Sequence, residues 1–510
     1  MHKAGFVVEK DWVKAIIDER LFSSFIEHLG RAVYQGIYEP NHPLADEQGF
    51  RKDVISLVKA LHLPLIRYPG GNFLSGYHWK DGIGPAGERP VRLDLAWQTL
   101  ESNRIGIGEF YDWTQKVGTN IMGCVNMGTG TPKEAGEFLE YCNFEKGTWW
   151  SDLRIHHGHP RPFGIKTWCI GNEMDGSWQI CAMDAAEYGK KARETAKIMK
   201  LIDPSVELVV CGSSGPKMPS YPEWDRIILE HAYEQVDYLS LHSYYENFGN
   251  DDDFLASFAS MDAFITAICA TANYVKALKR STKTMFLSFD EWNVWYQGRQ
   301  QPRKPFTGTP ASLLEDHYSL LDALVVGGLG ITLLNNADRV KIACLAQLVN
   351  VIAPIMTVPG GSAFVQTTYY PFRDLSLLGR GKLLQPLITS PRKETCYGDV
   401  PVAPAAAVYQ EEEGKLTIFT INTDTKIPLD LTVNLRSFHN SSADFWTELS
   451  SEDIHRKNSP EHPEAVQPIA REVTALALGK GVYHLRLKPA SWNVLRFTLG
   501  EGDPLHLETV

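Results

Sequence analysis

The segment Lys166–Gly176 reads KTWCIGNEMDG, an apolar run that stops at a glycine and continues into Asn172 and Glu173. This order is typical of a β-strand that ends in a carboxylic acid with a carboxamide beside it. A second segment of this kind, TMFLSFDEWNVWY, spans Thr284–Tyr296 and places Glu291 among aromatic residues. Two strand ends that carry carboxylic acids, with Trp and Asn around them, indicate a site that cleaves a glycosidic bond.

Short β-rich runs alternate with longer helical patterns from about residue 20 to residue 355. Several of the β-rich runs are almost continuously apolar, as expected for parallel strands that are buried on both faces. Eight such repeats are the signature of a (β/α)8 TIM barrel. The expected strands are Leu21–Glu27, Leu63–Tyr68, Thr119–Asn126, Ile165–Asn172, Val206–Gly212, Val236–His242, Thr284–Asp290 and Gly330–Asn335. The expected helices between them are Phe50–His62, Pro132–Asn143, Asp184–Ile202, Phe254–Arg280 and Ser312–Gly327.

Polar side chains follow each of the expected strands. Because the carboxyl ends of barrel strands meet on one face, these side chains are predicted to converge on one pocket. We expect about half of them to be helix N-caps or turn formers instead, first among them Ser213, Asn335 and Asn336. The polar residues at the strand ends include Glu27, Arg67, Asn72, Asn126, Asn172, Glu173, His242, Tyr244 and Glu291.

Glycoside hydrolysis needs one group that protonates the leaving oxygen and another that attacks the sugar or activates water. Glu173 and Glu291 form the best pair, and both are flanked by apolar and aromatic residues, which argues against two surface carboxylates. A nucleophile must stay ionised, so Arg67 and Tyr244 are expected beside it. Asn172 is placed to hydrogen bond a sugar hydroxyl. A separation of about 5 Å between the two carboxyl groups gives retention, and a wider gap gives inversion; sequence alone leaves the two outcomes open.

Trp97, Trp292 and Trp295 offer apolar faces for stacking on a sugar, although core packing is the favoured interpretation of Trp292. The histidines of the run His156–His159 have no carboxylate or cysteine within the run, so no metal site is predicted there. The run GIGPAG at Gly82–Gly87 contains a proline and opens no clear helix, which argues against a nucleotide loop. The sequence therefore predicts neither a metal nor a cofactor.

The composition of the 510-residue chain leaves room for one large barrel and a smaller second domain. Its net charge of −11 argues against non-specific nucleic-acid binding. We expect no run of membrane-spanning length and no signal peptide in the N-terminal MHKAGFVVEKDW, and hence a cytoplasmic protein. Four of the eight cysteines, at 124, 169, 211 and 344, lie in apolar runs and are predicted to be buried hydrophobic residues.

After about residue 375 the pattern changes to alternating apolar and polar residues, as in Leu429–Leu435. This predicts an antiparallel β-sandwich of about a hundred residues, to which Phe6–Val8 adds a strand. We therefore expect a barrel over 18–375 and a sandwich formed by 1–17 together with 376–510. Ser450–Glu464 is an expected exposed loop of the sandwich, and Gln297–Pro310 an expected mobile loop at the mouth of the site.

Six motifs resemble the α-L-arabinofuranosidases of glycoside hydrolase family 51 and occur in that family's order. They are FIEHLGRAVYQGIYEP, IRYPGGNFLSGYHWKDGIGP, TWCIGNEMDG, VDYLSLHSYY, LSFDEWNVWY and RVKIACLAQLVNVIAPIMT. The resemblance implies a retaining, exo-acting enzyme that releases terminal arabinofuranosyl groups from fragments of arabinan or arabinoxylan. It also implies a jelly-roll-like sandwich that includes the N-terminal segment, and a hexamer.

Site residues follow from the same resemblance. It implies that Glu173 is the acid/base and Glu291 the nucleophile. It implies sugar contacts from Glu27, Asn72, Asn172, Tyr244 and Gln347, with Trp97 and Trp295 at the mouth and His242 near the carboxylates. Gln347 is expected in a helix-like run after the eighth strand. The run LLNNAD around Asn335 and the segment Gln297–Pro310 depart from the family and leave the preferred linkage open.

Two alternatives remain at the level of sequence. A β-glucanase or a β-xylosidase on the same barrel shares the catalytic pair, and only the shape of the sugar pocket discriminates it. A carbohydrate-binding protein without activity is the third hypothesis, and it is disfavoured because both carboxylates and their neighbours are present.

Overall fold

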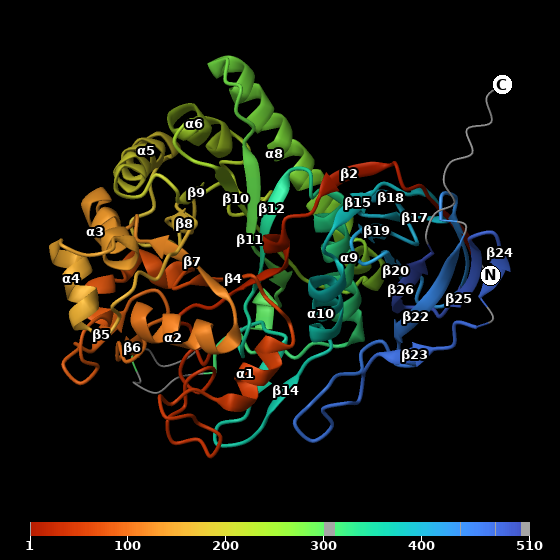
Figure 1. Ribbon diagram of the computed structural model, residues 1–510, viewed down its shortest axis with the longest axis horizontal. Coiled ribbons are helices and arrows are strands. Elements are labelled where there is room, and N and C mark those ends of the chain that lie inside the picture. The colour runs from red at the N-terminus through yellow and green to blue at the C-terminus, as the bar shows by residue number, and fades with distance from the viewer. Residues whose placement is uncertain (1, 300–305, 307–311, 439, 475, 501–510) are drawn as a thin grey trace.

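A computed structural model describes residues 2–299, 306, 312–438, 440–474 and 476–500. Its larger part is a closed barrel of eight parallel strands in the order β10-β11-β12-β3-β4-β7-β8-β9, which lies beside a smaller sheet-rich part in Figure 1. The barrel strands are β3 (Ser23–Phe25), β4 (Leu65–Tyr68), β7 (Asn120–Val125), β8 (Thr167–Ile170), β9 (Glu207–Val210), β10 (Tyr238–Tyr245), β11 (Phe286–Val294) and β12 (Val340–Ala346). The predicted TIM barrel is therefore confirmed.

The helices surround the barrel, and several begin at the capping residues that the sequence supplies. Thr131 and Asp184 accept the N–H groups of Glu134 and Glu187 three residues later, which fixes the starts of two of the helices. The helices are α1 (Lys52–Lys59), α2 (Ile107–Val117), α3 (Pro132–Asn143), α4 (Trp149–His156), α5 (Ala185–Ile202), α6 (Glu223–Ala232), α7 (Asp251–Leu255), α8 (Ser257–Lys279), α9 (Leu320–Asn335) and α10 (Tyr369–Leu378). Short 3-10 turns cover Glu19–Phe22, Asn72–Gly76, Trp79–Gly82 and Gln297–Arg299.

Seven of the eight expected strands are confirmed to within a few residues, and the eighth is wrong. Gly330–Asn335 forms the end of α9, and the eighth strand is β12. The expected helix over Ser312–Gly327 likewise begins later, at Leu320. Since α9 is buried on almost all sides, its sequence is apolar throughout and lacks the helical period that would distinguish it from a buried strand.

The side chains of Asn335 and Asn336 lie at the end of α9, away from the predicted pocket. Asn335 donates to the carbonyl of Ala405, and Asn336 donates to Asp262 and to the carbonyl of Thr332. Asn336 lies in the turn after α9, as expected, whereas Asn335 is the last helical residue and is neither an N-cap nor a turn residue.

The expected helix Phe254–Arg280 is divided into α7 and α8. Contrary to the expectation of no membrane-length run, the 23 residues of α8 are long and apolar enough to cross a membrane by length and composition alone. The same helix packs against α6 and α9 on the outside of the barrel. Packing against these two helices accounts for its apolar side chains.

The second part is a sandwich of two sheets with its own apolar core. One sheet has the order β16-β1-β21-β25-β24 and the other β2-β15-β19-β20-β26-β22-β23. The strands are β1 (His2–Val8), β2 (Val13–Ile16), β15 (Lys382–Leu384), β16 (Leu387–Thr389), β19 (Ala405–Gln410), β20 (Lys415–Asn422), β21 (Leu429–Leu435), β22 (Ser441–Leu449), β23 (Ile469–Arg471), β24 (Ala477–Gly479), β25 (Val482–Leu487) and β26 (Ser491–Leu499). The predicted N-terminal strand is confirmed, although β1 pairs with β21 in parallel and the sandwich is otherwise antiparallel.

Three two-stranded hairpins complete the described strands. They are β5 (Arg92–Asp94) with β6 (Thr99–Glu101), β13 (Ile355–Thr357) with β14 (Ala363–Val365), and β17 (Arg392–Thr395) with β18 (Gly398–Pro401).

The sandwich is joined to the barrel through α9 and α10. Trp492 of β26 packs on α9 at Gly327, where an added Cβ would lie 2.7 Å from the indole ring, and its N–H donates to Asp374 of α10 at 3.0 Å. The expected loop Ser450–Glu464 also takes part, because the carbonyls of Ile454 and Arg456 accept backbone N–H groups from the first turn of α9. These N–H groups have no partner within the helix, so the loop completes the hydrogen bonding of α9.

Candidate active site

A cavity of about 310 Å³ opens at the carboxyl ends of the barrel strands. Most of the predicted site residues line it: Glu27, Asn72, Trp97, Glu173, Tyr244, Glu291, Trp295 and Gln347. The remaining three, Arg67, Asn172 and His242, lie behind the wall and hydrogen bond to residues that line it. The topology thus brings together residues that are up to 320 positions apart in the chain, as for Glu27 and Gln347.

Glu291 lies within β11, and its buried carboxylate has a donor on each oxygen. Arg67 Nη1 donates to Oε1 at 2.7 Å, and the hydroxyl of Tyr244 donates to Oε2 at 2.6 Å. Arg67 also donates to the side-chain oxygen of Asn172 at 2.7 Å, so one guanidinium orients two predicted site residues. A buried carboxylate that accepts from a guanidinium and a phenol is suited to act as an ionised nucleophile.

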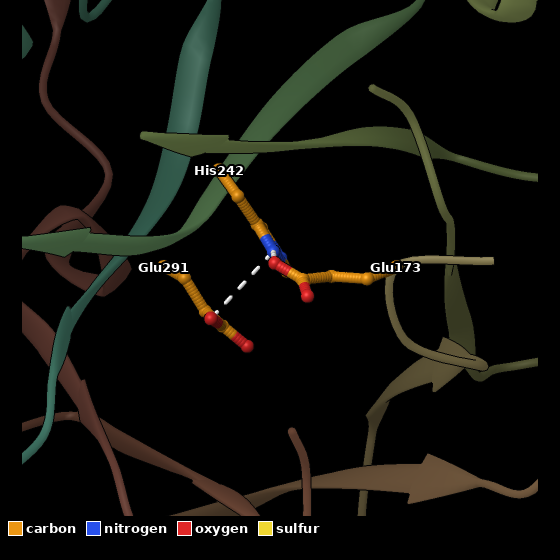
Figure 2. A group of neighbouring side chains, drawn as sticks. All are labelled: Glu173, His242 and Glu291. Atoms are coloured by element: carbon orange, nitrogen blue, oxygen red, sulfur yellow. Dashed lines mark hydrogen bonds and ion pairs between the residues drawn. The ribbon is translucent and has the colours of Figure 1, made fainter. Parts of the chain in front are cut away.

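Glu173 follows β8 and approaches the cavity from the opposite side, as Figure 2 shows. Its Oε1 is 2.9 Å from Nδ1 of His242, and its Oε2 accepts the indole N–H of Trp178 at 2.6 Å. The backbone of Glu173 has a φ of +46°, a conformation that costs a residue with a side chain about 1 kcal/mol or more. The tight turn that begins at Gly171 (φ +94°) thus directs the carboxyl group toward Glu291.

The two carboxyl groups lie close together. The carboxylate oxygens of Glu173 and Glu291 and the imidazole nitrogen of His242 are all within 4.8 Å of one another, and Nδ1 of His242 is 3.6 Å from Oε2 of Glu291 (Figure 2). This spacing matches the separation of about 5 Å that retaining glycosidases use, and it leaves too little room for the water of an inverting enzyme.

His242 is surrounded by three carboxylates. Its Nε2 lies 3.2 Å from Oδ1 of Asp290, while its Nδ1 faces Glu173 and Glu291. Burial alone would lower the pKa of His242, but the charges of Glu291 and Asp290 and the hydrogen bonds to Asp290 and Glu173 outweigh it and raise the pKa to about 10. The imidazole is therefore charged at neutral pH; its Nδ1–H donates to Glu173, and its Nε2 faces Asp290 as an ion pair.

Glu173, His242 and Glu291 form the one group among the described residues that is close enough to share a metal ion. Each oxygen of Glu291 already accepts a hydrogen bond, Oε2 of Glu173 accepts the indole N–H of Trp178, and Oε1 of Glu173 faces Nδ1 of His242. The geometry therefore favours a charge-balanced catalytic group over a metal site.

Glu27 follows β3 and is a further buried acidic residue of the cavity, in addition to Glu173 and Glu291. It accepts the backbone N–H of Phe73 at 2.8 Å, the indole N–H of Trp97 at 2.7 Å and the side-chain amide of Gln347 at 3.2 Å. Burial raises the pKa of Glu27 well above its usual value, although the first two of these hydrogen bonds oppose the shift. Gly71 passes so close that an added Cβ would lie 2.2 Å from the carboxyl group, which explains a glycine at that position.

Gln347 follows β12 directly, so the expectation of a helix-like run after the eighth strand is wrong. The misplaced eighth strand is the cause of this error. The run VKIACLA at Val340–Ala346 forms the true strand, and a strand assignment there would have placed Gln347 at a strand end like the other site residues.

Sequence reasoning missed Asp290, although it immediately precedes Glu291. Its carboxylate lies 3.7 Å from Nε of Arg67 and accepts the thiol of Cys169 at 3.4 Å and the hydroxyl of Ser240. Burial would raise the pKa of Asp290, but the charges of Arg67 and His242 lower it. In a regular strand, the side chains of two neighbouring residues point to opposite faces of the sheet. The register of β11 against β12 shifts between Phe289 and Trp292, which interrupts this alternation. Asp290 and Glu291 therefore both reach the same charged network.

Several other residues singled out in the sequence lie outside the cavity and have structural roles. Trp292 is buried against Phe372, which confirms core packing. Ser213 donates to the buried carboxylate of Asp225 and does not line the cavity. All four cysteines from the apolar runs are buried. The expected loop Gln297–Pro310 lies largely outside the described residues.

Residues contributed by loops were not predicted either. Trp178 and Ser214 line the cavity from the loops that follow β8 and β9, Leu314 from the segment before α9, and Ile352 from the segment after β12. None of them follows a strand directly, so the strand-end pattern carries no signal for them.

A TIM barrel with two buried glutamates within 4.8 Å of each other at the carboxyl ends of its strands defines a glycoside hydrolase of the retaining type. The sequence matches two family models, "Alpha-L-arabinofuranosidase 1 domain" over residues 57–256 and "Alpha-L-arabinofuranosidase C-terminal domain" over residues 290–491. The chain belongs to the α-L-arabinofuranosidases of glycoside hydrolase family 51.

Relatives of this family match the chain over nearly its whole length. It is 51% identical to the "Intracellular exo-alpha-(1->5)-L-arabinofuranosidase 1" of Bacillus subtilis, with 97% of the chain and 99% of the relative covered. It is 45% identical to an "Exo-alpha-(1->6)-L-arabinofuranosidase" of Bifidobacterium longum, with 97% of each covered. The solved structure of AbfB, a family 51 α-L-arabinofuranosidase from Bifidobacterium longum, superposes with a TM-score of 0.94 at 44% identity and covers 98% of the chain and 100% of its own.

Proposed function

We propose that this protein is a retaining exo-α-L-arabinofuranosidase in which Glu291 is the nucleophile and Glu173 the acid/base. It removes terminal non-reducing α-L-arabinofuranosyl groups from arabino-oligosaccharides that derive from arabinan or arabinoxylan. The observation that carries the proposal is the close approach of two glutamates with different partners, a guanidinium and a phenol on Glu291 and an imidazole and an indole on Glu173.

In the first step, Glu291 attacks the anomeric carbon while Glu173 gives its proton to the glycosidic oxygen. The bond between the anomeric carbon and that oxygen breaks, the shortened oligosaccharide leaves as an alcohol, and the sugar stays bound to Glu291 as an ester. Arg67 and Tyr244 hold the two oxygens of Glu291 in place for this attack.

In the second step, the ionised Glu173 takes a proton from a water molecule, and the resulting nucleophile attacks the anomeric carbon on the face that the leaving group vacated. The ester breaks and arabinose is released with its original anomeric configuration. The charged His242 donates to Oε1 of Glu173, and Trp178 donates to Oε2. These two donors fix the orientation of a carboxyl group that must act first as an acid and then as a base.

The remaining predicted residues form the pocket for the cleaved sugar. Glu27 is held by three donors and presents a buried carboxyl group to sugar hydroxyls. Asn172 and Asn72 hydrogen bond to each other at 3.3 Å, and Gln347 lines the pocket and donates to Glu27 at 3.2 Å. Trp97 and Trp295 line its mouth. A hydroxyl that binds these groups more strongly in the transition state contributes to the rate.

The relatives support the substrate class and the compartment. They are named as exo-acting arabinofuranosidases for (1->5) or (1->6) linkages, and several are named intracellular. We therefore place the enzyme in the cytoplasm, where it acts on imported oligosaccharides. A β-glucanase, a β-xylosidase and an inactive binding protein are not favoured, because relatives at about half identity over the full length are arabinofuranosidases.

The experiment that tests this function is the cleavage of an aryl α-L-arabinofuranoside in the presence of methanol, with the product followed by NMR. Methyl α-L-arabinofuranoside is the expected product, since methanol replaces water in the second step. The β-anomer would contradict the two-step route. If sugar were released from an aryl xyloside or a β-glucan but not from the arabinofuranoside, the enzyme would belong to a different substrate class.

Two further features belong to the proposal. We assign the barrel to 18–375 and the sandwich to 1–17 together with 376–510, supported by the pairing of β1 with β21. The resemblance to family 51 also supports a hexamer, which light scattering would reveal as a mass six times that of the 57.2 kDa chain. A monomer mass would reject this assembly and leave the reaction assignment unaffected.

A further inference from the structure

A buried ion pair beside the sugar pocket has no part in the mechanism described above. His28 directly follows Glu27 in the chain, and its Nδ1 lies 2.9 Å from Oε2 of Glu101. The side chains of His28 and Glu101 are 1% and 8% exposed. Because two charges are costly to remove from water, a buried ion pair contributes little net stability, so this one calls for another explanation.

Glu101 belongs to the hairpin that carries Trp97. It is the last residue of β6 and lies at the base of the β5–β6 hairpin. Trp97 lies at the tip, between Asp94 of β5 and Thr99 of β6, and its indole N–H donates to Oε1 of Glu27 at 2.7 Å. A hairpin with three residues in each strand has too few hydrogen bonds to be stable alone, so its position depends on contacts with the barrel.

Contacts at Glu101 hold the base of this hairpin against the barrel. Its Oε2 faces His28, and its Oε1 accepts the hydroxyl of Tyr34 at 2.5 Å and the backbone N–H of Asn103 at 2.6 Å. Burial alone would raise the pKa of Glu101, but the charge of His28 and the hydrogen bonds from His28 and Tyr34 outweigh it and lower the pKa. The carboxylate is therefore ionised at neutral pH.

The ring of His28 also supports a second donor of the sugar pocket. Its Nε2 lies 2.7 Å from the hydroxyl of Tyr68 on β4, so both ring nitrogens are engaged. The ring stacks on Phe73, with the centroids 4.9 Å apart and an interplanar angle of 18°. The backbone N–H of Phe73 donates to Oε1 of Glu27 at 2.8 Å, and the same oxygen accepts the indole N–H of Trp97. Both donors to this oxygen are therefore connected to His28, one through the stacked ring and one through the hairpin.

The hairpin lies among three buried acids, and His28 is the ion-pair partner that this group has. Glu27, Asp94 and Glu101 are 2%, 6% and 6% exposed. Burial, together with the charge of Glu101, raises the pKa of Asp94 to about 6, and the charge of Asp94 adds to the effect of burial on Glu27. Among the ion pairs of the described residues, that of His28 with Glu101 is the one that involves any of the three acids. Loss of the histidine would leave these neighbouring carboxyl groups without a partner of opposite charge.

From these contacts we propose that His28 and Glu101 are positioning residues for the sugar pocket. Their ion pair holds the β5–β6 hairpin in the position from which Trp97 donates to Glu27. Neither His28 nor Glu101 lines the catalytic cavity, so both act through other residues. A displacement of Trp97 by about 1 Å would already break its hydrogen bond of 2.7 Å. The inference rests on the proposed function, in which Glu27 contacts hydroxyls of the cleaved arabinofuranosyl group.

The test measures kcat/KM on an aryl α-L-arabinofuranoside for Glu101→Gln and His28→Phe, each in the wild-type protein and in Trp97→Phe. Glu101→Gln removes the charge at nearly constant shape, and His28→Phe keeps a ring that stacks on Phe73 but cannot donate. We expect each substitution to lower kcat/KM of the wild type about 10-fold, the effect of losing one hydrogen bond to a buried carboxyl group. Since Trp97→Phe already lacks that hydrogen bond, each should lower its kcat/KM by less than about 2-fold.

The matched control is a histidine–glutamate pair at the surface. The side chains of His78 and Glu134 are 52% and 30% exposed, and Nδ1 of the histidine lies 3.8 Å from Oε1 of the glutamate. Because an exposed pair of this kind holds no segment in place, His78→Phe and Glu134→Gln should leave kcat/KM unchanged.

Losses by the same factor in the wild type and in Trp97→Phe would overturn the proposal, because a purely structural role lowers the fraction of active protein whether or not Trp97 is present. An unchanged kcat/KM in both variants would overturn it as well. If His28→Phe does not fold, Glu101→Gln alone decides between these outcomes, since its amide keeps the shape of the side chain. If the wild-type protein cleaves no arabinofuranoside at all, the proposed function itself fails, so the two failures are distinguishable.

Discussion

The charge on His242 gives the most detailed prediction, because its three carboxylate neighbours raise its pKa from 6.5 to about 10. A shift of this size corresponds to about 4 kcal/mol of stabilisation of the folded protein at pH 7, where the unfolded histidine is mostly neutral. Since the folded pKa lies above the unfolded one, this contribution is fully present below about pH 6.5. It is lost as the pH rises through about 10.

We therefore expect His242→Gln to unfold at a lower temperature than the wild type at pH 7. A glutamine can donate to one carboxylate but cannot balance the charges of Asp290 and Glu291. For a chain of this length, whose entropy of unfolding is about 1 kcal/mol/K, 4 kcal/mol corresponds to a fall in Tm of about 4 °C. At pH 10.5 the wild-type imidazole has lost most of its proton, and the difference in Tm between the two proteins should shrink to about 1 °C or less.

The assay is differential scanning calorimetry of both proteins at the two pH values, with His156→Gln as the control. His156 is an exposed histidine in the last turn of α4, and its substitution should change Tm little at either pH. If the difference in Tm between wild type and His242→Gln were equally large at pH 7 and pH 10.5, this prediction would be wrong. Such a result would mean that the charge of the imidazole does not stabilise the site.

Three further predictions concern the reaction. Glu173→Gln should lower kcat for the hydrolysis of an unactivated arabinobiose by about 10³-fold. It should lower kcat for a dinitrophenyl arabinofuranoside much less, because a good leaving group needs no proton. Equal losses of kcat on both substrates would contradict the role of Glu173 as the acid. Trp97→Phe removes the indole donor to Glu27 at 2.7 Å, and steady-state kinetics should show kcat/KM lower by about 10-fold; an unchanged value would show that this hydrogen bond does not order the pocket. Dialysis against a chelator should leave kcat unchanged, because the oxygens of Glu291 and Oε2 of Glu173 are already engaged by hydrogen-bond donors of the protein; a loss of activity that zinc or calcium restores would contradict this.

The sequence was sufficient for the barrel and for the two glutamates because each signal is local. An apolar strand that ends in an acid can be recognised within a dozen residues, as in Lys166–Gly176. The eighth strand could not be found in this way. The barrel and the sandwich together bury α9 on almost all sides, so Leu320–Asn335 is as uniformly apolar as a strand, and the error carried over to the placement of Gln347.

The electrostatic design of the site depends on contacts between distant segments. Asp290 forms ion pairs with Arg67 and His242, which lie 223 and 48 positions away in the chain. No local sequence pattern indicates these contacts. The same holds for Trp178 and for the ion pair of His28 with Glu101, since loops reach the cavity only through the assembled fold. Sequence therefore indicates which residues end at the barrel mouth, and the structure is needed to show how they are paired.

Azide rescue tests most directly how the catalytic roles are divided between Glu291 and Glu173. With Glu291→Ala, azide enters the space of the missing carboxylate and attacks the substrate from the β-face, so we expect β-L-arabinofuranosyl azide. With Glu173→Ala, azide attacks the ester on Glu291 from the α-face, so we expect α-L-arabinofuranosyl azide from an activated aryl substrate. The opposite pairing of variant and anomer in the NMR spectrum would contradict the assignment of both residues.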